Sequence, residues 1–117
     1  MRLALVVLFI LTLGINVVES SQPSTKKFLE EIDTDKFDSY LYGLESGLDW
    51  ANELLFRERG IEIFCKPNDL EVSAILLKKF LREEIARNTS FYKKYENEPL
   101  IGLAFRNAYL QRFPCEK

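Results

Sequence analysis

The sequence predicts a small all-α domain of four to five helices with one disulfide. Apolar residues recur at three- and four-residue steps along several stretches of the chain, which is the spacing of helices that bury one face. No segment offers two extended runs that could pair as strands. The chain contains 2 cysteines, Cys65 and Cys115, which suffice for a single crosslink.

Residues 1–20 have the layout of a cleavable secretory signal peptide. Arg2 gives a positive start, an apolar run covers residues 3–13, and Val18 and Ser20 lie three and one residues before a cut after residue 20. A membrane anchor is the alternative, but the apolar run would extend only about 16 Å as a helix, against about 30 Å of hydrocarbon. We therefore expect residues 21–117 to form one exported domain without a membrane span.

In an oxidising compartment we expect Cys65 and Cys115 to pair. The disulfide would close a loop of about 50 residues, for which chain entropy predicts a stabilisation of about 4 kcal/mol. It would also tie down the C-terminal end, which otherwise frays. A reactive thiol is the alternative, but the chain has 0 histidines to activate one.

The first two helices follow a polar lead-in. Apolar residues then predict a short helix that ends near Thr34. Residues 35–57 have apolar side chains at helical spacing and predict a long amphipathic helix. Gly60 predicts its end, and the alternating IEIFC at 61–65 predicts an extended connector.

Two glycines, Gly43 and Gly47, lie four residues apart on one face of the long predicted helix. Glycine within a helix costs about 1 kcal/mol relative to alanine, so we expect a compensating contact. A close crossing with another helix, where a side chain would not fit, is the preferred interpretation. Close approach of a partner's backbone is the alternative.

Two further long helices complete the predicted domain. Asn68, with Glu71 three residues later, predicts a capping box at the start of a helix that ends near Arg87. The last helix is expected to begin just before Pro99 and to stop at Pro114. It is apolar round most of its circumference, which indicates a place in the middle of the core or in a dimer interface.

Residues 88–99 are the least regular stretch. Their aromatic residues alternate with charges, which suits a surface that binds a partner and equally suits a short helix whose aromatic side chains face the core. The residues predicted to bind a partner are Tyr92, Lys93, Lys94, Tyr95 and Glu96. The connector at 57–62 is a second candidate.

The sequence offers little for catalysis. The absence of histidine removes Ser-His-Asp and Cys-His catalysis and the commonest zinc ligand. The adjacent carboxylates at 30–31 and 83–84 diverge by about 100° on a helix. The formal net charge of −2 has no basic block, which argues against a nucleic-acid partner. We expect a binding protein with no cofactor or metal, not an enzyme.

Four stretches, within residues 37–115, carry a recognisable pattern. They are YLYGLESGL (40–48), IFCKPNDL (63–70), KKFLREEI (78–85) and AFRNAYLQRFPC (104–115). Together they resemble the Rap/Tai family of immunity proteins, which protect bacteria against peptidoglycan amidase toxins delivered by type VI secretion.

The resemblance implies a periplasmic all-helical protein, often a homodimer, that binds a cognate secreted amidase toxin and blocks its active-site cleft. The amidase would carry the catalytic cysteine and histidine, and this chain would supply an obstructing surface. A periplasmic stress chaperone or envelope accessory protein is the alternative, because small exported helical proteins with one disulfide include acid-activated chaperones. Without histidine, such switching would be confined to below about pH 5.

Overall fold

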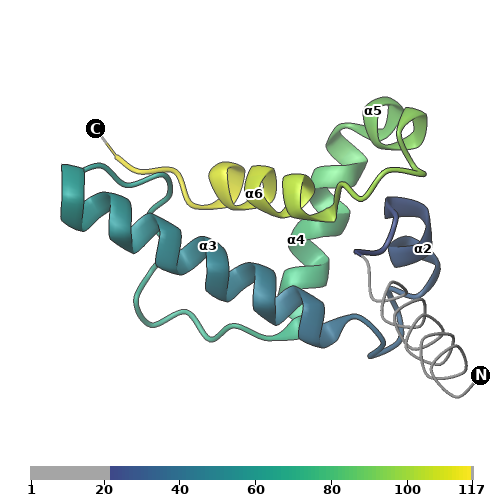
Figure 1. Ribbon diagram of the computed structural model, residues 1–117, viewed down its shortest axis with the longest axis horizontal. Coiled ribbons are helices and arrows are strands. Elements are labelled where there is room, and N and C mark those ends of the chain that lie inside the picture. The colour runs from purple at the N-terminus through teal and green to yellow at the C-terminus, as the bar shows by residue number, and fades with distance from the viewer. Residues whose placement is uncertain (1–21, 117) are drawn as a thin grey trace, which may run out of the picture.

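The protein is described by a computed structural model that covers residues 22–116 (Figure 1). Five helices follow in chain order within that range: α2 (Thr25–Glu30), α3 (Asp38–Arg59), α4 (Ala74–Arg87), α5 (Thr89–Lys94) and α6 (Ile101–Arg112). This part of the chain has no strand, and Cys65 is bonded to Cys115. The predicted all-α class with one disulfide is therefore confirmed. The predicted signal peptide at 1–20 lies outside the described residues.

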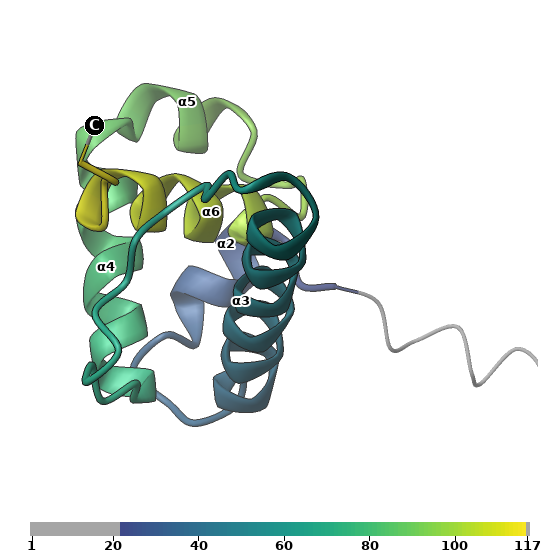
Figure 2. The ribbon, with the colours of Figure 1, turned by 90° about the vertical axis from the view of Figure 1, so that its left-hand side faces the viewer.

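Helix α6 is central to the molecule. It lies crosswise to both α3 and α4 (Figure 2), while α2 and α5 lie at the end away from the C-terminus (Figure 1). Its buried residues share the core with residues from the other helices and the connector, including Phe28, Leu41, Phe64, Leu77 and Leu81. The apolar circumference of α6 is thus explained by packing within one chain. No helix among the described residues is long and apolar enough to cross a membrane.

Helix α2 ends at Glu30, before the predicted end near Thr34, and α3 spans Asp38–Arg59 against the predicted 35–57. Helix α2 begins at Thr25 because the Ser24 hydroxyl accepts a hydrogen bond from the Lys27 N–H at 3.1 Å. Gly60 ends α3 in the left-handed conformation, at φ 66°, which glycine adopts without steric cost. Its N–H donates to the Phe56 carbonyl at 2.8 Å, so the predicted stop at Gly60 is confirmed.

The predicted close crossing at Gly43 and Gly47 is wrong. A Cβ atom at either position would have no heavy atom within 4 Å beyond its own helical surroundings, so both lie on the open face of α3. The close approach between α3 and α6 occurs at Gly102, where a Cβ would lie 3.7 Å from Leu44 Cδ2. Glycine spacing within one helix does not reveal which face meets a neighbour.

The predicted cap at Asn68 and Glu71 is also wrong, because α4 begins only at Ala74. The Ser73 hydroxyl accepts a hydrogen bond from the Leu76 N–H at 3.2 Å, and the Tyr42 hydroxyl accepts one from the Ala74 N–H at 2.9 Å. These two acceptors satisfy N–H groups that a helix start leaves free. Residues 61–73 therefore form one non-helical connector that returns from the end of α3 to α4.

Candidate protein-binding groove

A groove separates the second half of α3 from the connector. It has a volume of about 410 Å³ and lies between residues 49–56 of α3 and residues 62–70 of the connector. Its aromatic residues are Trp50, Phe56 and Phe64. We refer to this feature as the α3–connector groove.

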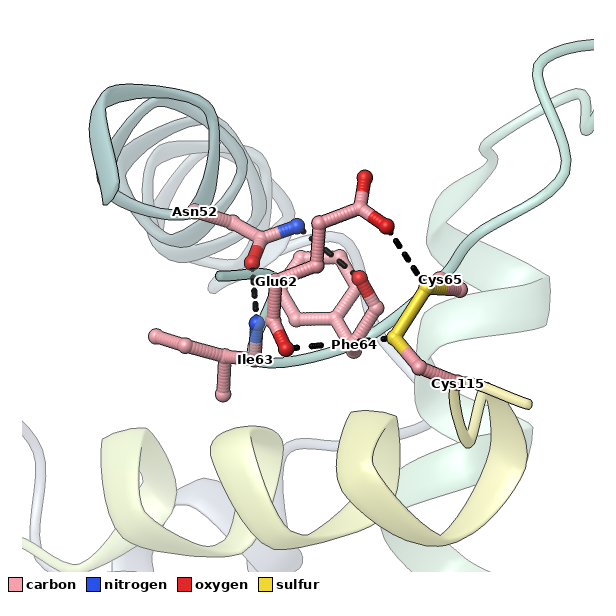
Figure 3. Close-up of a disulfide and its surroundings, with 6 residues drawn as sticks. All are labelled: Asn52, Glu62, Ile63, Phe64, Cys65 and Cys115. Carbon is pink, nitrogen blue, oxygen red and sulfur yellow. Dashed lines mark hydrogen bonds between the residues drawn. A yellow bond between two sulfur atoms is a disulfide. The ribbon is translucent and has the colours of Figure 1, made fainter. Parts of the chain in front are cut away.

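Asn52 holds the connector against α3. Its side chain is 8% exposed, its Nδ2 donates to the Phe64 carbonyl at 3.0 Å, and its Oδ1 accepts from the Ile63 N–H at 2.6 Å (Figure 3). One amide thus satisfies two backbone groups of a segment that has no strand neighbour. The Phe64 ring is inserted into the core and meets the Tyr109 ring edge-on, with centroids 5.2 Å apart.

The disulfide fixes the same segment to the end of α6. The Cα atoms of Cys65 and Cys115 are 4.9 Å apart, and the Cys65 N–H donates to the Phe113 carbonyl at 2.8 Å. A carboxylate oxygen of Glu62 lies 2.9 Å from Cys65 Sγ (Figure 3). A disulfide sulfur has no hydrogen to donate, so this is a contact and leaves the carboxylate without a donor there.

A polar cluster extends from the core to the groove, where Asp49 and Lys66 line the wall. The Tyr109 hydroxyl donates to Glu45 Oε2, and Lys66 Nζ lies 3.1 Å from Glu45 Oε1 and 3.3 Å from Asp49 Oδ1. Burial, and then the hydrogen bond to Glu45, raise the pKa of Tyr109 above its usual value. The side chain of Lys66 is only 15% exposed, so its ammonium is committed to these two carboxylates.

The rim of the groove exposes large apolar side chains. Trp50 is 67% exposed and Phe56 is 54% exposed, and both line the groove. Leu54, Ile61 and Ile63, in the same end of α3 and the turn that follows, are 40–55% exposed. A cluster of exposed apolar side chains of this kind is typical of a surface that contacts another molecule.

The structure divides the predicted partner-binding residues of α5. Tyr92 is only 2% exposed, and its hydroxyl donates to Glu84 Oε2 at 2.7 Å, so the prediction that it contacts a partner is wrong. Burial and the bond to Glu84 raise the pKa of Tyr92 to about 12. Tyr92 instead fits the alternative interpretation, a short helix whose aromatic side chains face the core, because its hydrogen bond to Glu84 connects α5 to α4.

The other four predicted residues lie at the surface of α5 and just after it. Lys93, Lys94 and Tyr95 are exposed and Glu96 is half-buried. Lys93 pairs with Glu96 at 3.0 Å, and the Lys94 ammonium lies 5.3 Å from the centroid of the Tyr95 ring. These side-chain contacts are local, whereas the Glu96 carbonyl accepts a hydrogen bond from the Lys26 N–H of α2 at 2.8 Å. All four residues lie outside the α3–connector groove.

The sequence prediction missed Trp50 and Phe56 as surface residues. Both fall off the apolar stripe that identified the long helix, since the stripe passes through Leu44, Leu48 and Leu55. Their position outside the buried stripe was the sequence signal that could have identified them as exposed aromatic residues. The second predicted surface, residues 57–62, does adjoin the groove through Glu62.

A metal site at the disulfide does not fit the chemistry of its atoms. A Glu62 carboxylate oxygen and the sulfurs of Cys65 and Cys115 all lie within 4.8 Å of one another. The sulfur ligand of a metal is a thiolate, and both sulfurs are bonded to each other.

No family model, curated protein or solved structure matches the chain. Its function is therefore inferred from the residues of the groove and from the sequence pattern.

Proposed function

We propose that the protein is a periplasmic immunity protein that binds a cognate peptidoglycan amidase toxin and blocks its active-site cleft. The observation that carries the binding function is the α3–connector groove with Trp50 and Phe56 exposed at its edge. Aromatic residues are enriched at protein–protein interfaces, and Trp is prominent among the residues whose truncation costs most affinity. The choice of an amidase as partner comes from the sequence resemblance.

One of the four stretches that carry the resemblance lines the groove, and a second is bonded to it. Residues 63–70 supply one wall through Phe64, Lys66 and Leu70. Residues 104–115 end at Cys115, which is bonded to Cys65 in that wall. The Phe-Cys and Pro-Cys motifs are thus the two halves of one structural element, which supports a common role for them in presenting the surface.

Inhibition by obstruction requires a rigid surface and no chemistry from this chain. The charged groups behind the groove serve structural contacts, since Glu45 binds Tyr109 and Lys66. The exported location follows in this proposal from the signal peptide predicted at 1–20, and a disulfide suits that compartment.

The test uses the purified oxidised protein and the amidase toxin recovered with it by affinity pull-down from a toxin-producing culture of the same strain. The amidase is assayed on peptidoglycan fragments with increasing amounts of the protein. We expect stoichiometric inhibition, and light scattering of the complex will show whether the protein binds as the homodimer that the resemblance implies.

Two variants connect inhibition with the groove. Trp50→Ala should weaken inhibition by about thirtyfold, as expected for an interface residue worth about 2 kcal/mol, without lowering the melting temperature. Ile75→Ala is the matched control, because Ile75 is 82% exposed on α4 and does not line the groove.

Full amidase activity in excess protein would refute the proposal. Suppressed aggregation of unrelated proteins at low pH would instead favour the chaperone alternative.

A further inference from the structure

We infer that the α3–connector groove accepts a cationic side chain, an arginine or a lysine, from the surface of the protein partner. This inference specifies the chemistry of the partner and rests on the proposed function only for the identity of that partner. It follows from the walls of the groove, its charges and its size.

The groove offers aromatic faces to a cation. Trp50 and Phe56 lie on α3 and are more than half exposed. A guanidinium or ammonium held over such a ring is attracted by the electrons of the ring face, most strongly for Trp. Arginine also stacks its planar head on aromatic rings.

The charges of the groove are mostly negative. Lys66 is balanced by two carboxylates, Glu45 at 3.1 Å and Asp49 at 3.3 Å, which leaves one negative charge over. Glu53 is compensated by Arg57 at 2.6 Å.

Glu62 adds the second uncompensated charge. It lines the groove, and no lysine or arginine nitrogen among the described residues lies within 4.0 Å of its carboxylate. The three acidic residues of the groove and Glu45 carry four negative charges against the two positive charges of Lys66 and Arg57, which leaves two net negative charges. Such a local field attracts cations and repels anions.

The groove is large enough for the guest. Its volume of about 410 Å³ lies within the range of about 300–1,000 Å³ for pockets that enclose whole small ligands. A single arginine or lysine side chain presented by a partner therefore fits into it. Leu54, Ile61 and Ile63 are exposed beside this part of α3, and apolar neighbours of this kind exclude water around a central contact.

Trp50 allows a direct test, because it is the only tryptophan in the chain. The purified oxidised protein is titrated with the blocked peptide Gly-Ser-Arg-Ser-Gly and with the same peptide carrying citrulline, which has nearly the shape of arginine but no charge. We expect a saturable change in tryptophan fluorescence with the arginine peptide and binding at least about fivefold weaker with citrulline. Identical titrations with the two peptides would overturn the inference.

Charge variants locate the site. Asp49→Asn together with Glu62→Gln should weaken binding of the arginine peptide by about tenfold, as the loss of two exposed charge-assisted contacts predicts, while Lys66 keeps its pair with Glu45. Glu30→Gln on α2 removes an exposed carboxylate outside the groove and should leave binding unchanged. Equal binding by the double variant and the unaltered protein would overturn the inference.

The peptide titration and the inhibition assay separate the two proposals. Discrimination between arginine and citrulline with no inhibition of the amidase supports the groove and refutes the immunity function. Inhibition without that discrimination supports the immunity function and refutes the cationic guest.

Discussion

Removal of the disulfide should cost the protein a large share of its stability. Cys65 and Cys115 are separated by 50 positions in sequence, and restricting an unfolded loop of that length is worth about 4 kcal/mol by the chain-entropy relation. Single domains have a total free energy of unfolding of about 5–15 kcal/mol. For a domain of this size about 4 kcal/mol corresponds to a fall of about 15–30 °C in melting temperature.

The assay compares thermal unfolding of the oxidised protein with that of a variant carrying both Cys65→Ser and Cys115→Ser, followed by circular dichroism. The oxidised protein measured in reductant is the control, and its melting temperature should fall to that of the double variant. A fall of less than about 5 °C would refute the reasoning, because it would mean that less than about 1 kcal/mol comes from the crosslink. Packing of Phe113 against Phe80, with ring centroids 5.7 Å apart, would then hold the end of α6 by itself.

Three further predictions concern single side chains. Tyr109→Phe removes the buried hydroxyl that donates to Glu45 and should lower the free energy of unfolding in urea by about 1–3 kcal/mol; an unchanged unfolding midpoint would contradict a structural role for that bond. Tyr92 has a pKa raised from 10.0 to about 12. The protonated hydroxyl therefore contributes its full share to the free energy of unfolding below pH 10, and this share is lost as the pH rises through about 12. The Tyr92→Phe variant should therefore lose less stability than the unaltered protein over that interval, and equal losses would argue against this assignment. Gly43→Ala, with open space around it, should raise the free energy of unfolding in urea by about 1 kcal/mol, whereas Gly60→Ala at φ 66° should lower it by about 1 kcal/mol; the reverse order would mean that the two backbone positions are misassigned.

The helices were predictable from sequence because their signals are local. Apolar spacing located α3, α4 and α6, and Gly60 marked the end of α3 where the chain turns left-handed. The start of α4 was less predictable. Asn68 and Glu71 have the spacing of a cap, but the acceptors at the helix start come from Ser73 and from Tyr42 on another helix. A hydroxyl supplied from another helix leaves no local pattern.

The surface was harder to predict than the core. Tyr92 stands among charged residues, a pattern that predicts a partner contact, yet Glu84 on α4 gives its hydroxyl a buried acceptor at 2.7 Å. Trp50 belongs to the predicted long helix but lies off its buried stripe, so helical periodicity gave it no role. Which aromatic residue turns inward depends on a partner from another helix, and that information is in the tertiary structure.

The stiffness of the groove connects the fold with the proposed binding. Residues 61–73 lack regular secondary structure, and ordering a free segment upon binding would cost about 1–2 kcal/mol per residue. In this protein Asn52 holds the segment through Ile63 and Phe64, and the disulfide fixes it at Cys65. The wall facing Trp50 is therefore largely ordered before a partner arrives, so more of the contact energy can appear as affinity. Reduction of the disulfide would free the connector at Cys65 but leave Trp50 on an intact α3. We therefore expect reduction to weaken binding, although the disulfide itself lies away from the exposed aromatic residues.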